Sequence, residues 1–66
     1  MSRDMRDFCT RLRSSYLDLQ MLMGRVDSLA GVAPTEFSRS LLRGVSRDMS
    51  WERDRLKDVY SMVCEV

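Results

Sequence analysis

Apolar residues recur every three or four positions along the first half of the chain, which is the spacing of one face of an α-helix. This row occupies heptad positions a and d and is interrupted once, at Ser15. Its members are Met5, Phe8, Leu12, Leu19, Leu22, Val26 and Leu29. Beside it, at position e, lie Cys9, Tyr16, Met23 and Ala30. The pattern predicts a helix over about residues 3–30, with Ser2 as its N-cap.

The same spacing resumes in the second half of the chain and is again interrupted once, at Glu52. The members of this row are Leu42, Val45, Met49, Leu56, Val59, Val63 and Val66. It predicts a second helix over about residues 34–64. We therefore expect an all-α fold, an antiparallel helical hairpin that forms a single domain over residues 1–66. The side chains expected to carry this fold are Leu12, Leu19, Leu22, Leu42, Met49 and Leu56.

A short turn is predicted between the two rows. Gly31 supplies the left-handed residue that commonly ends a helix, and Pro34 fits the first position of the next one. Glu36 follows where its carboxylate can reach the exposed amides. The turn is thus expected at residues 31–33, and so short a connection makes the helices antiparallel neighbours.

The tetrapeptide SRDM occurs twice, at residues 2–5 and again at residues 46–49. If Gly44 and Ser46 broke the second half into two helices, the heptad phase would be free to reset there. It continues unchanged, so we predict one long helix in which the second SRDM is internal. The alternative is a kink or break at Gly44, which costs about 1 kcal/mol relative to Ala in a helix interior.

The predicted turn also sets which residues face each other. Because the turn is centred near residues 32 and 33, two residues that face each other across the hairpin have numbers that sum to about 66. Ser15 then lies level with Glu52, which predicts a polar layer that fixes the register of the helices. The alternative is that Glu52 turns its carboxylate out to water.

The same register keeps the two cysteines apart. The residue opposite Cys64 is near position 2 or 3, about 10 Å along the axis from Cys9. A disulfide tolerates Cα separations only up to about 7 Å, so we expect free buried thiols. The chain has no His and no C-x-x-C, so no metal site is expected either.

A chain of 66 residues has a marginal core, because folding at this size buries only about 60% of the unfolded surface. Without a disulfide or a metal, we expect a second copy or a partner protein to complete a helical bundle. Wide apolar faces favour this, since a hairpin has only one interior side. The expected partner-binding residues outside the rows are Leu17, Met21, Phe37, Leu41, Trp51 and Met62.

The charge distribution favours a nucleic-acid partner less strongly than the apolar faces favour a protein partner. Eleven basic and ten acidic residues leave a net charge of +1. Arg39, Arg43 and Arg47 are spaced to form a ridge that could follow phosphates, doubled in a dimer. Glu36 and Asp48 lie beside this ridge and weaken its field, and no aromatic residues alternate with it for base stacking. A solvated charged surface is the simpler interpretation.

The residues for catalysis are lacking. His, the commonest general base, is absent, and the three glycines stand apart, so there is no phosphate loop. We expect no enzyme activity, no cofactor and no small-molecule substrate. No run of 18 or more apolar residues occurs, and the start MSRDMRDF is too charged for a signal peptide. These observations predict a soluble protein of a reducing compartment, the cytoplasm, without membrane contact.

The stretch LAGVAPTEF, residues 29–37, is similar to the short co-chaperones of type III secretion needle subunits. A helix, a Gly-x-x-Pro turn and an aromatic-led second helix recur there. In length and architecture the chain also resembles hairpins that dimerise into four-helix bundles, such as the plasmid RNA-regulating hairpins. The likeness covers the turn and the general pattern. The expected function is a non-enzymatic protein-interaction module, an adaptor, assembly factor, inhibitor or co-chaperone; the alternative is a small nucleic-acid-binding regulator.

Overall fold

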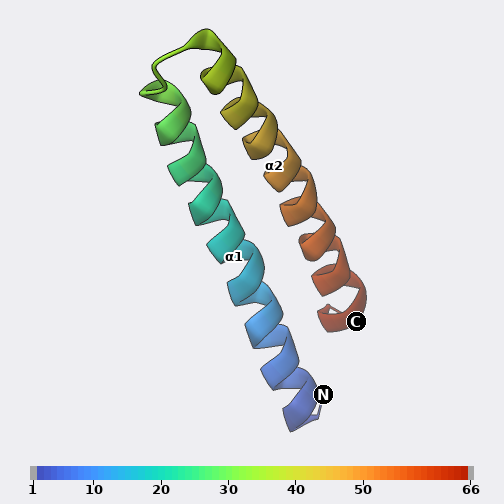
Figure 1. The fold of residues 1–66 in the computed structure, drawn as a ribbon. Helices are drawn as coiled ribbons and strands as arrows, with labels where there is room; N and C mark the ends of the chain where they lie inside the picture. Colours follow the sequence, from blue (N-terminus) through green and yellow to red (C-terminus); the bar gives the residue numbers. More distant parts are fainter. Residues whose placement is uncertain (1, 66) are drawn as a thin grey trace.

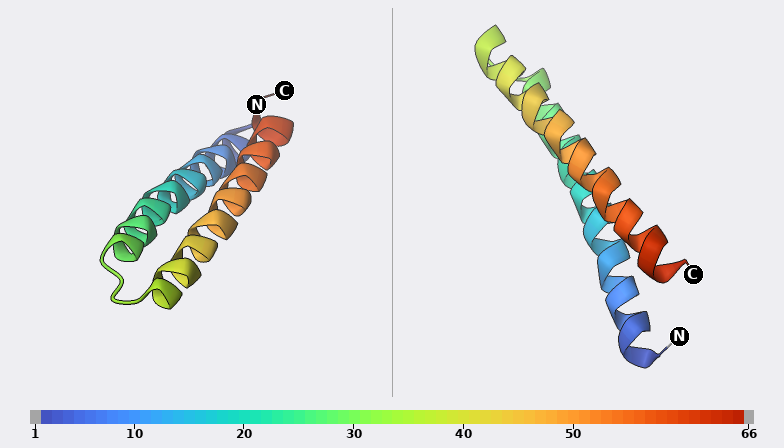
Figure 2. Two further views of the ribbon diagram at one scale, coloured as in Figure 1. Left: turned by 90° about the horizontal axis from the view of Figure 1, so that it is seen from above. Right: turned by 90° about the vertical axis from the view of Figure 1, so that its right-hand side faces the viewer.

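The computed structural model describes residues 2–65, and they form an antiparallel helical hairpin (Figure 1). Helix α1 spans Arg3–Gly31 and helix α2 spans Glu36–Cys64. The two rods cross at a shallow angle, and the Cα atoms fill an envelope of 51 × 15 × 11 Å (Figure 2). The predicted all-helical hairpin is confirmed. Helix α2 runs without interruption through Gly44, so the second SRDM lies inside a helix. Val66 of the predicted row lies outside the described residues.

Side-chain caps start both helices. The Ser2 hydroxyl accepts a hydrogen bond from the Met5 amide at 3.1 Å, as expected. Helix α2 starts later than expected, with Thr35 as its N-cap. Thr35 Oγ1 accepts from the Ser38 amide at 3.1 Å, and Ser38 Oγ accepts from the Thr35 amide at 3.3 Å. This reciprocal capping box satisfies the first amides. The prediction that Pro34 begins the helix is therefore wrong.

Helix α1 also ends differently from the prediction. Gly31 keeps a negative φ, like every glycine in the part of the chain that the structure describes. The Val32 amide donates to the Leu29 carbonyl at 3.2 Å, and the Ala33 amide donates to the Ala30 carbonyl at 3.3 Å. Tightened i to i−3 bonds thus replace the left-handed glycine cap.

The connection runs along the helix axis rather than straight across. The backbone of Thr35 is extended, with φ −132° and ψ 156°. Helix α2 consequently starts beyond the end of α1, and the first turns of α1 project past the end of α2 (Figure 1). Facing residues have numbers that sum to about 75 rather than about 66, a slide of two to three helical turns.

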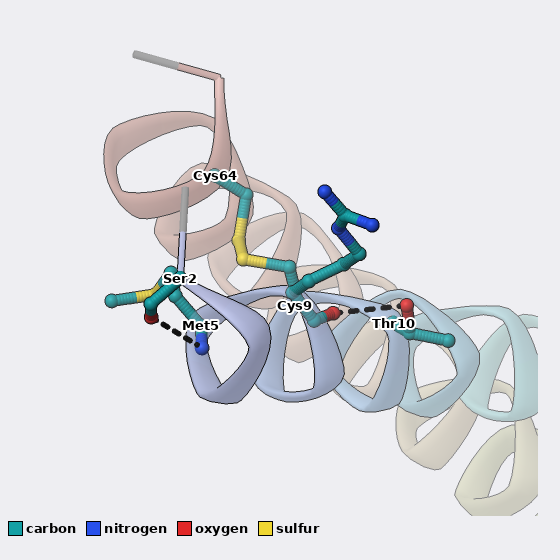
Figure 3. The surroundings of a disulfide bond; sticks show 6 residues. Ser2, Met5, Cys9, Thr10 and Cys64 are labelled. Atoms are coloured by element: carbon teal, nitrogen blue, oxygen red, sulfur yellow. Dashed lines mark hydrogen bonds between the residues drawn. A yellow bond between two sulfur atoms is a disulfide. The ribbon is translucent and has the colours of Figure 1, made fainter.

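This slide brings the two cysteines together. Cys9, early in α1, and Cys64, the last residue of α2, form a disulfide with a Cα–Cα distance of 5.9 Å (Figure 3). The prediction of free thiols is wrong, because it placed Cys64 opposite residue 2 or 3, about two turns too close to the start of α1. The bridge joins two residues that are 55 positions apart in the sequence, and it closes the open end of the hairpin. It supplies the covalent staple that a chain of this size commonly needs.

We call the row of side chains between the helices the seam. Every member is buried or half-buried. On α1 the seam consists of Cys9, Leu12, Tyr16, Leu19, Met23, Val26 and Ala30. On α2 it consists of Arg39, Leu42, Ser46, Met49, Arg53, Leu56, Tyr60 and Val63. The fully buried members are small, namely Cys9, Ala30 and Ser46. The rings of Tyr16 and Tyr60 pack edge to face with centroids 5.9 Å apart.

The seam uses heptad positions a and e, not the predicted a and d. Five of the six predicted core side chains lie in it, namely Leu12, Leu19, Leu42, Met49 and Leu56. Leu22, at position d, is 48% exposed, so its prediction as a core residue is wrong. The Tyr16–Tyr60 contact holds position e of both helices in the seam, and the Cys9–Cys64 bridge does the same for α1. This rotation turns position d outward.

Candidate protein-interaction surface

The hairpin leaves many large apolar side chains in contact with solvent. Eight of them occupy positions d and g of the two helices or the residue that follows α1, and each is at least 37% exposed. They are Phe8, Leu22, Leu29, Val32, Leu41, Val45, Val59 and Met62. A hairpin of two helices offers these side chains no third element to pack against.

The rotation of each helix places these residues on one side of the hairpin. Leu22 follows Leu19 by three residues and Met23 follows it by four, so Leu22 points about 80° from the middle of the seam. Val45 stands in the same relation to Leu42. An antiparallel pair has an approximate two-fold axis perpendicular to its plane, so equivalent heptad positions share a face. We call this set of eight residues the exposed apolar face.

Two shallow depressions lie along this face. One, near the turn, is lined by Arg25, Ser28, Leu29 and Val32. The other, near the open end, is lined by Ser2, Asp4, Met5, Phe8 and Val63. Both are open to solvent and mainly apolar. Such shallow apolar hollows suit protruding side chains of another protein better than a small molecule, which prefers a deep cavity.

Charged residues border the middle of the exposed apolar face. At position g, α1 carries Arg11, Asp18 and Arg25 in turn, and α2 carries Asp48 and Arg55. Both signs are therefore present on each helix. Arg55 Nη1 lies 3.5 Å from Glu52 Oε1 on its own helix, an exposed pair that contributes little to stability.

The six predicted partner-binding residues do not form one surface, although all are exposed. Leu41 and Met62 belong to the exposed apolar face. Met21 follows Leu19 by two residues and Trp51 follows Met49 by two, so each points directly away from the seam. They lie at opposite edges of the hairpin, with Leu17 on the edge of α1 and Phe37 on that of α2. Leu17, Met21 and Trp51 therefore do not share one surface of the hairpin, and their role in partner binding stays a prediction.

The predicted polar layer does not form either. With the observed register, Ser15 and Glu52 lie about two turns apart along the axis. The Ser15 hydroxyl donates to the Arg11 carbonyl at 2.9 Å, within its own helix. Glu52 is exposed and pairs with Arg55. Its carboxylate thus faces solvent, as the alternative interpretation held.

The predicted arginine ridge is divided between two environments. Arg39 is half-buried in the seam, where Nε donates to the Ala30 carbonyl at 3.4 Å and Nη1 pairs with Glu36 at 2.8 Å. The Ala30 carbonyl, at the end of α1, thus accepts from both the Ala33 amide and the Arg39 side chain. Arg43 and Arg47 remain on exposed positions. An unforeseen arginine, Arg53, also lies in the seam, bonded to Ser50 Oγ at 3.3 Å and Asp54 Oδ1 at 3.0 Å.

Across residues 2–65, no three His, Cys, Asp or Glu side chains gather where they could hold a metal ion. In the same part of the chain, neither helix combines the length and apolar character needed to cross a membrane.

Comparisons of the chain with protein-family models, with curated proteins and with solved structures find no match. The exposed apolar face must therefore be interpreted from its own residues. What stands out is a row of large apolar side chains that the fold leaves uncovered.

Proposed function

We propose that this protein is a small, non-enzymatic protein-interaction module that binds through the exposed apolar face. The observation that carries the proposal is the rotation of the helices, which turns heptad position d out of the seam and leaves eight large apolar side chains in contact with solvent. Leu22 and Leu29 are 48% and 55% exposed, while Ser46 is buried. Clusters of large exposed apolar side chains such as these mark protein-binding sites on soluble domains.

Four roles fit such a module: adaptor, assembly factor, inhibitor and co-chaperone. Each requires only that the chain cover, or be covered by, apolar surface of another polypeptide. The hairpin offers a stiff surface for this, because the bridge at one end and the turn at the other limit the relative motion of the helices. The cost of ordering the surface on binding is correspondingly small.

Photo-crosslinking tests this function. A benzoyl-phenylalanine at Leu29 should give a defined protein adduct in cells that express the full chain, because Leu29 lies on the exposed apolar face. The same group at Trp51, on the outer edge of α2, is the matched control and should give none. Adding Val45→Gln should remove the Leu29 adduct. Equal adducts from both positions, or none from Leu29, would contradict the proposal.

A cytoplasmic location stays a prediction, and the bridge provides its test. Disulfides persist in oxidising compartments and are rare in the cytosol. Alkylation of thiols in intact cells, followed by mass measurement, should show free Cys9 and Cys64 if the chain resides in the cytoplasm. A chain that resists alkylation until it is reduced would place the protein in an oxidising compartment.

A further inference from the structure

We infer that the partner on the exposed apolar face is a second copy of this chain, and that the two hairpins form a four-helix bundle with both turns at the same end. The inference rests on the proposed function, since it names the occupant of the same face. In this bundle a two-fold axis runs parallel to the helices. Helix α1 of each copy then faces helix α2 of the other.

Charge complementarity supports this arrangement. Because the two-fold axis runs parallel to the helices, residues of the two copies that lie at the same height along this axis contact each other. The register within one hairpin therefore also sets the contacts between the copies. Asp18 faces Arg55 of the second copy, and Arg25 faces Asp48 of the second copy. Each contact occurs twice by symmetry. Opposite charges at position g are a recognised means of selecting partner and orientation in helical assemblies.

Four of the apolar residues, those nearest the turn, also meet in this register. Leu29 meets Val45 of the second copy at position d, and Val32 meets Leu41 of the second copy at position g. These four residues are between 47% and 77% exposed in the single hairpin. Positions a and d of all four helices then line one common core, with position e against one neighbour and position g against the other.

The size of the face is adequate for a stable dimer. Taking the 51 Å length and the 15 Å width of the Cα envelope, one side of the hairpin covers roughly 760 Å² in projection. A standard specific interface buries about 800 Å² on each partner. Covering this one side therefore supplies the area that a stable dimer requires.

The other two-fold arrangement is less favourable. An axis perpendicular to the helices would pack each helix against its own copy, with the turn of one hairpin at the open end of the other. Glu52 lies at position d, near the middle of α2. With the perpendicular axis its two copies would lie on neighbouring helices in the centre of the interface, whereas with the parallel axis each copy faces Leu22 of the second chain and the two carboxylates lie on diagonally opposite helices. Two carboxylates brought together without a cation repel each other and lose hydration.

A charge swap tests the inference. Sedimentation equilibrium of the full oxidised chain should show a dimer, and Asp18→Arg should weaken it about tenfold, because the introduced guanidinium would face Arg55 of the second copy twice. The double variant Asp18→Arg, Arg55→Asp should restore the affinity. Asp27→Arg, the same charge change on the opposite face of α1, is the matched control and should leave it unchanged. Circular dichroism confirms that each variant stays helical.

Three outcomes would overturn the inference. A wild-type chain that stays monomeric at every concentration excludes the second copy. A double variant weaker than Asp18→Arg alone favours the perpendicular axis, since Asp48 would then face the carboxylate introduced at position 55 of the second copy. Equal weakening by Asp27→Arg removes the role of the exposed apolar face. A monomeric chain whose Leu29 position still crosslinks to a different protein would defeat this inference and leave the proposed function standing.

Discussion

The seam and the exposed apolar face are rows of side chains on the same two helices, set about 80° apart around each helix. The seam is enclosed between the helices, whereas the exposed apolar face is in contact with solvent. The seam is closed by the Cys9–Cys64 bridge and contains polar groups such as Ser46 and Arg53. The exposed apolar face carries large apolar side chains, including Phe8 and Leu29, and each of its eight members is at least 37% exposed in the hairpin. Large apolar side chains thus line one solvent-facing side of the hairpin as well as its seam.

This difference indicates two sources of stability in one small chain. The bridge stabilises the hairpin through a covalent link, so the seam can accommodate a hydroxyl and arginine stems. Burial of the exposed apolar face would stabilise the assembly instead, at about 25 cal/mol for each Å² removed from water. The hairpin and its association should therefore respond to different substitutions.

The largest expected effect comes from removing the bridge. Cys9→Ser should lower the free energy of unfolding by about 4 kcal/mol, because the bridge closes a loop with a sequence separation of 55 residues. Urea unfolding of the oxidised wild type and the variant measures the difference. Reduced wild type should match the variant. Equal stability of the oxidised and reduced chains would show that the seam does not depend on its staple.

A smaller effect should separate the two rows directly. Leu19→Ala in the seam should cost the hairpin about 2 kcal/mol, at the low end for a buried leucine because Leu19 is only half-buried. Leu22→Ala, the same change three residues away, should cost the monomer less than about 1 kcal/mol, because Leu22 is 48% exposed. Unfolding at concentrations below the dissociation constant measures both.

The order should reverse for association. Leu22→Ala removes a side chain from the exposed apolar face and should weaken the dimer, whereas Leu19→Ala should act mainly through the folding of each hairpin. A dilution series of each variant gives the two dissociation constants. If both variants lose the same stability and the same affinity, the division into seam and exposed apolar face is wrong.

A substitution that touches neither row should raise stability. Gly44 lies inside α2, and a Cβ placed there would meet no atom within 4 Å. Gly44→Ala should therefore stabilise the hairpin by roughly 0.5–1 kcal/mol through helix propensity alone, with no change in dimer affinity. Thermal unfolding at low concentration measures the gain. A loss of stability would show that α2 bends or packs at Gly44.

The smallest effect is expected at the outer edge. Trp51 is 66% exposed but points away from both rows. Trp51→Gln should change hairpin stability by less than about 0.5 kcal/mol and leave association intact. Sedimentation of the variant beside wild type measures this. Dissociation of the dimer by this change would place the binding surface on the edge instead.

Much of the fold could be predicted from the sequence. The three-four spacing predicts both helices, and its unbroken phase predicts that α2 continues through Gly44 and the second SRDM. These features depend on local periodicity, which needs no knowledge of the tertiary structure. The N-cap at Ser2 is local in the same sense.

The register and the rotation of the helices could not be predicted in this way. The extended backbone at Thr35 slides α2 along α1. The number of residues in the turn does not reveal whether the chain crosses directly to the second helix or first continues along the helix axis. Position e of α2 carries Arg39, Ser46 and Arg53, which look like surface residues, so the sequence favoured position d for the core. The Tyr16–Tyr60 pair and Cys9 were the available signals for position e.

The mass of the oxidised chain across a dilution series tests the central claim most directly. The chain has a mass of 7.7 kDa, and we predict a species of twice that mass that dissociates to single hairpins on dilution while its helicity stays unchanged. Leu22→Ala should shift the transition to higher concentration. A helical, bridged chain that stays at 7.7 kDa up to millimolar concentration would contradict the account, because its exposed apolar face would then need no second copy.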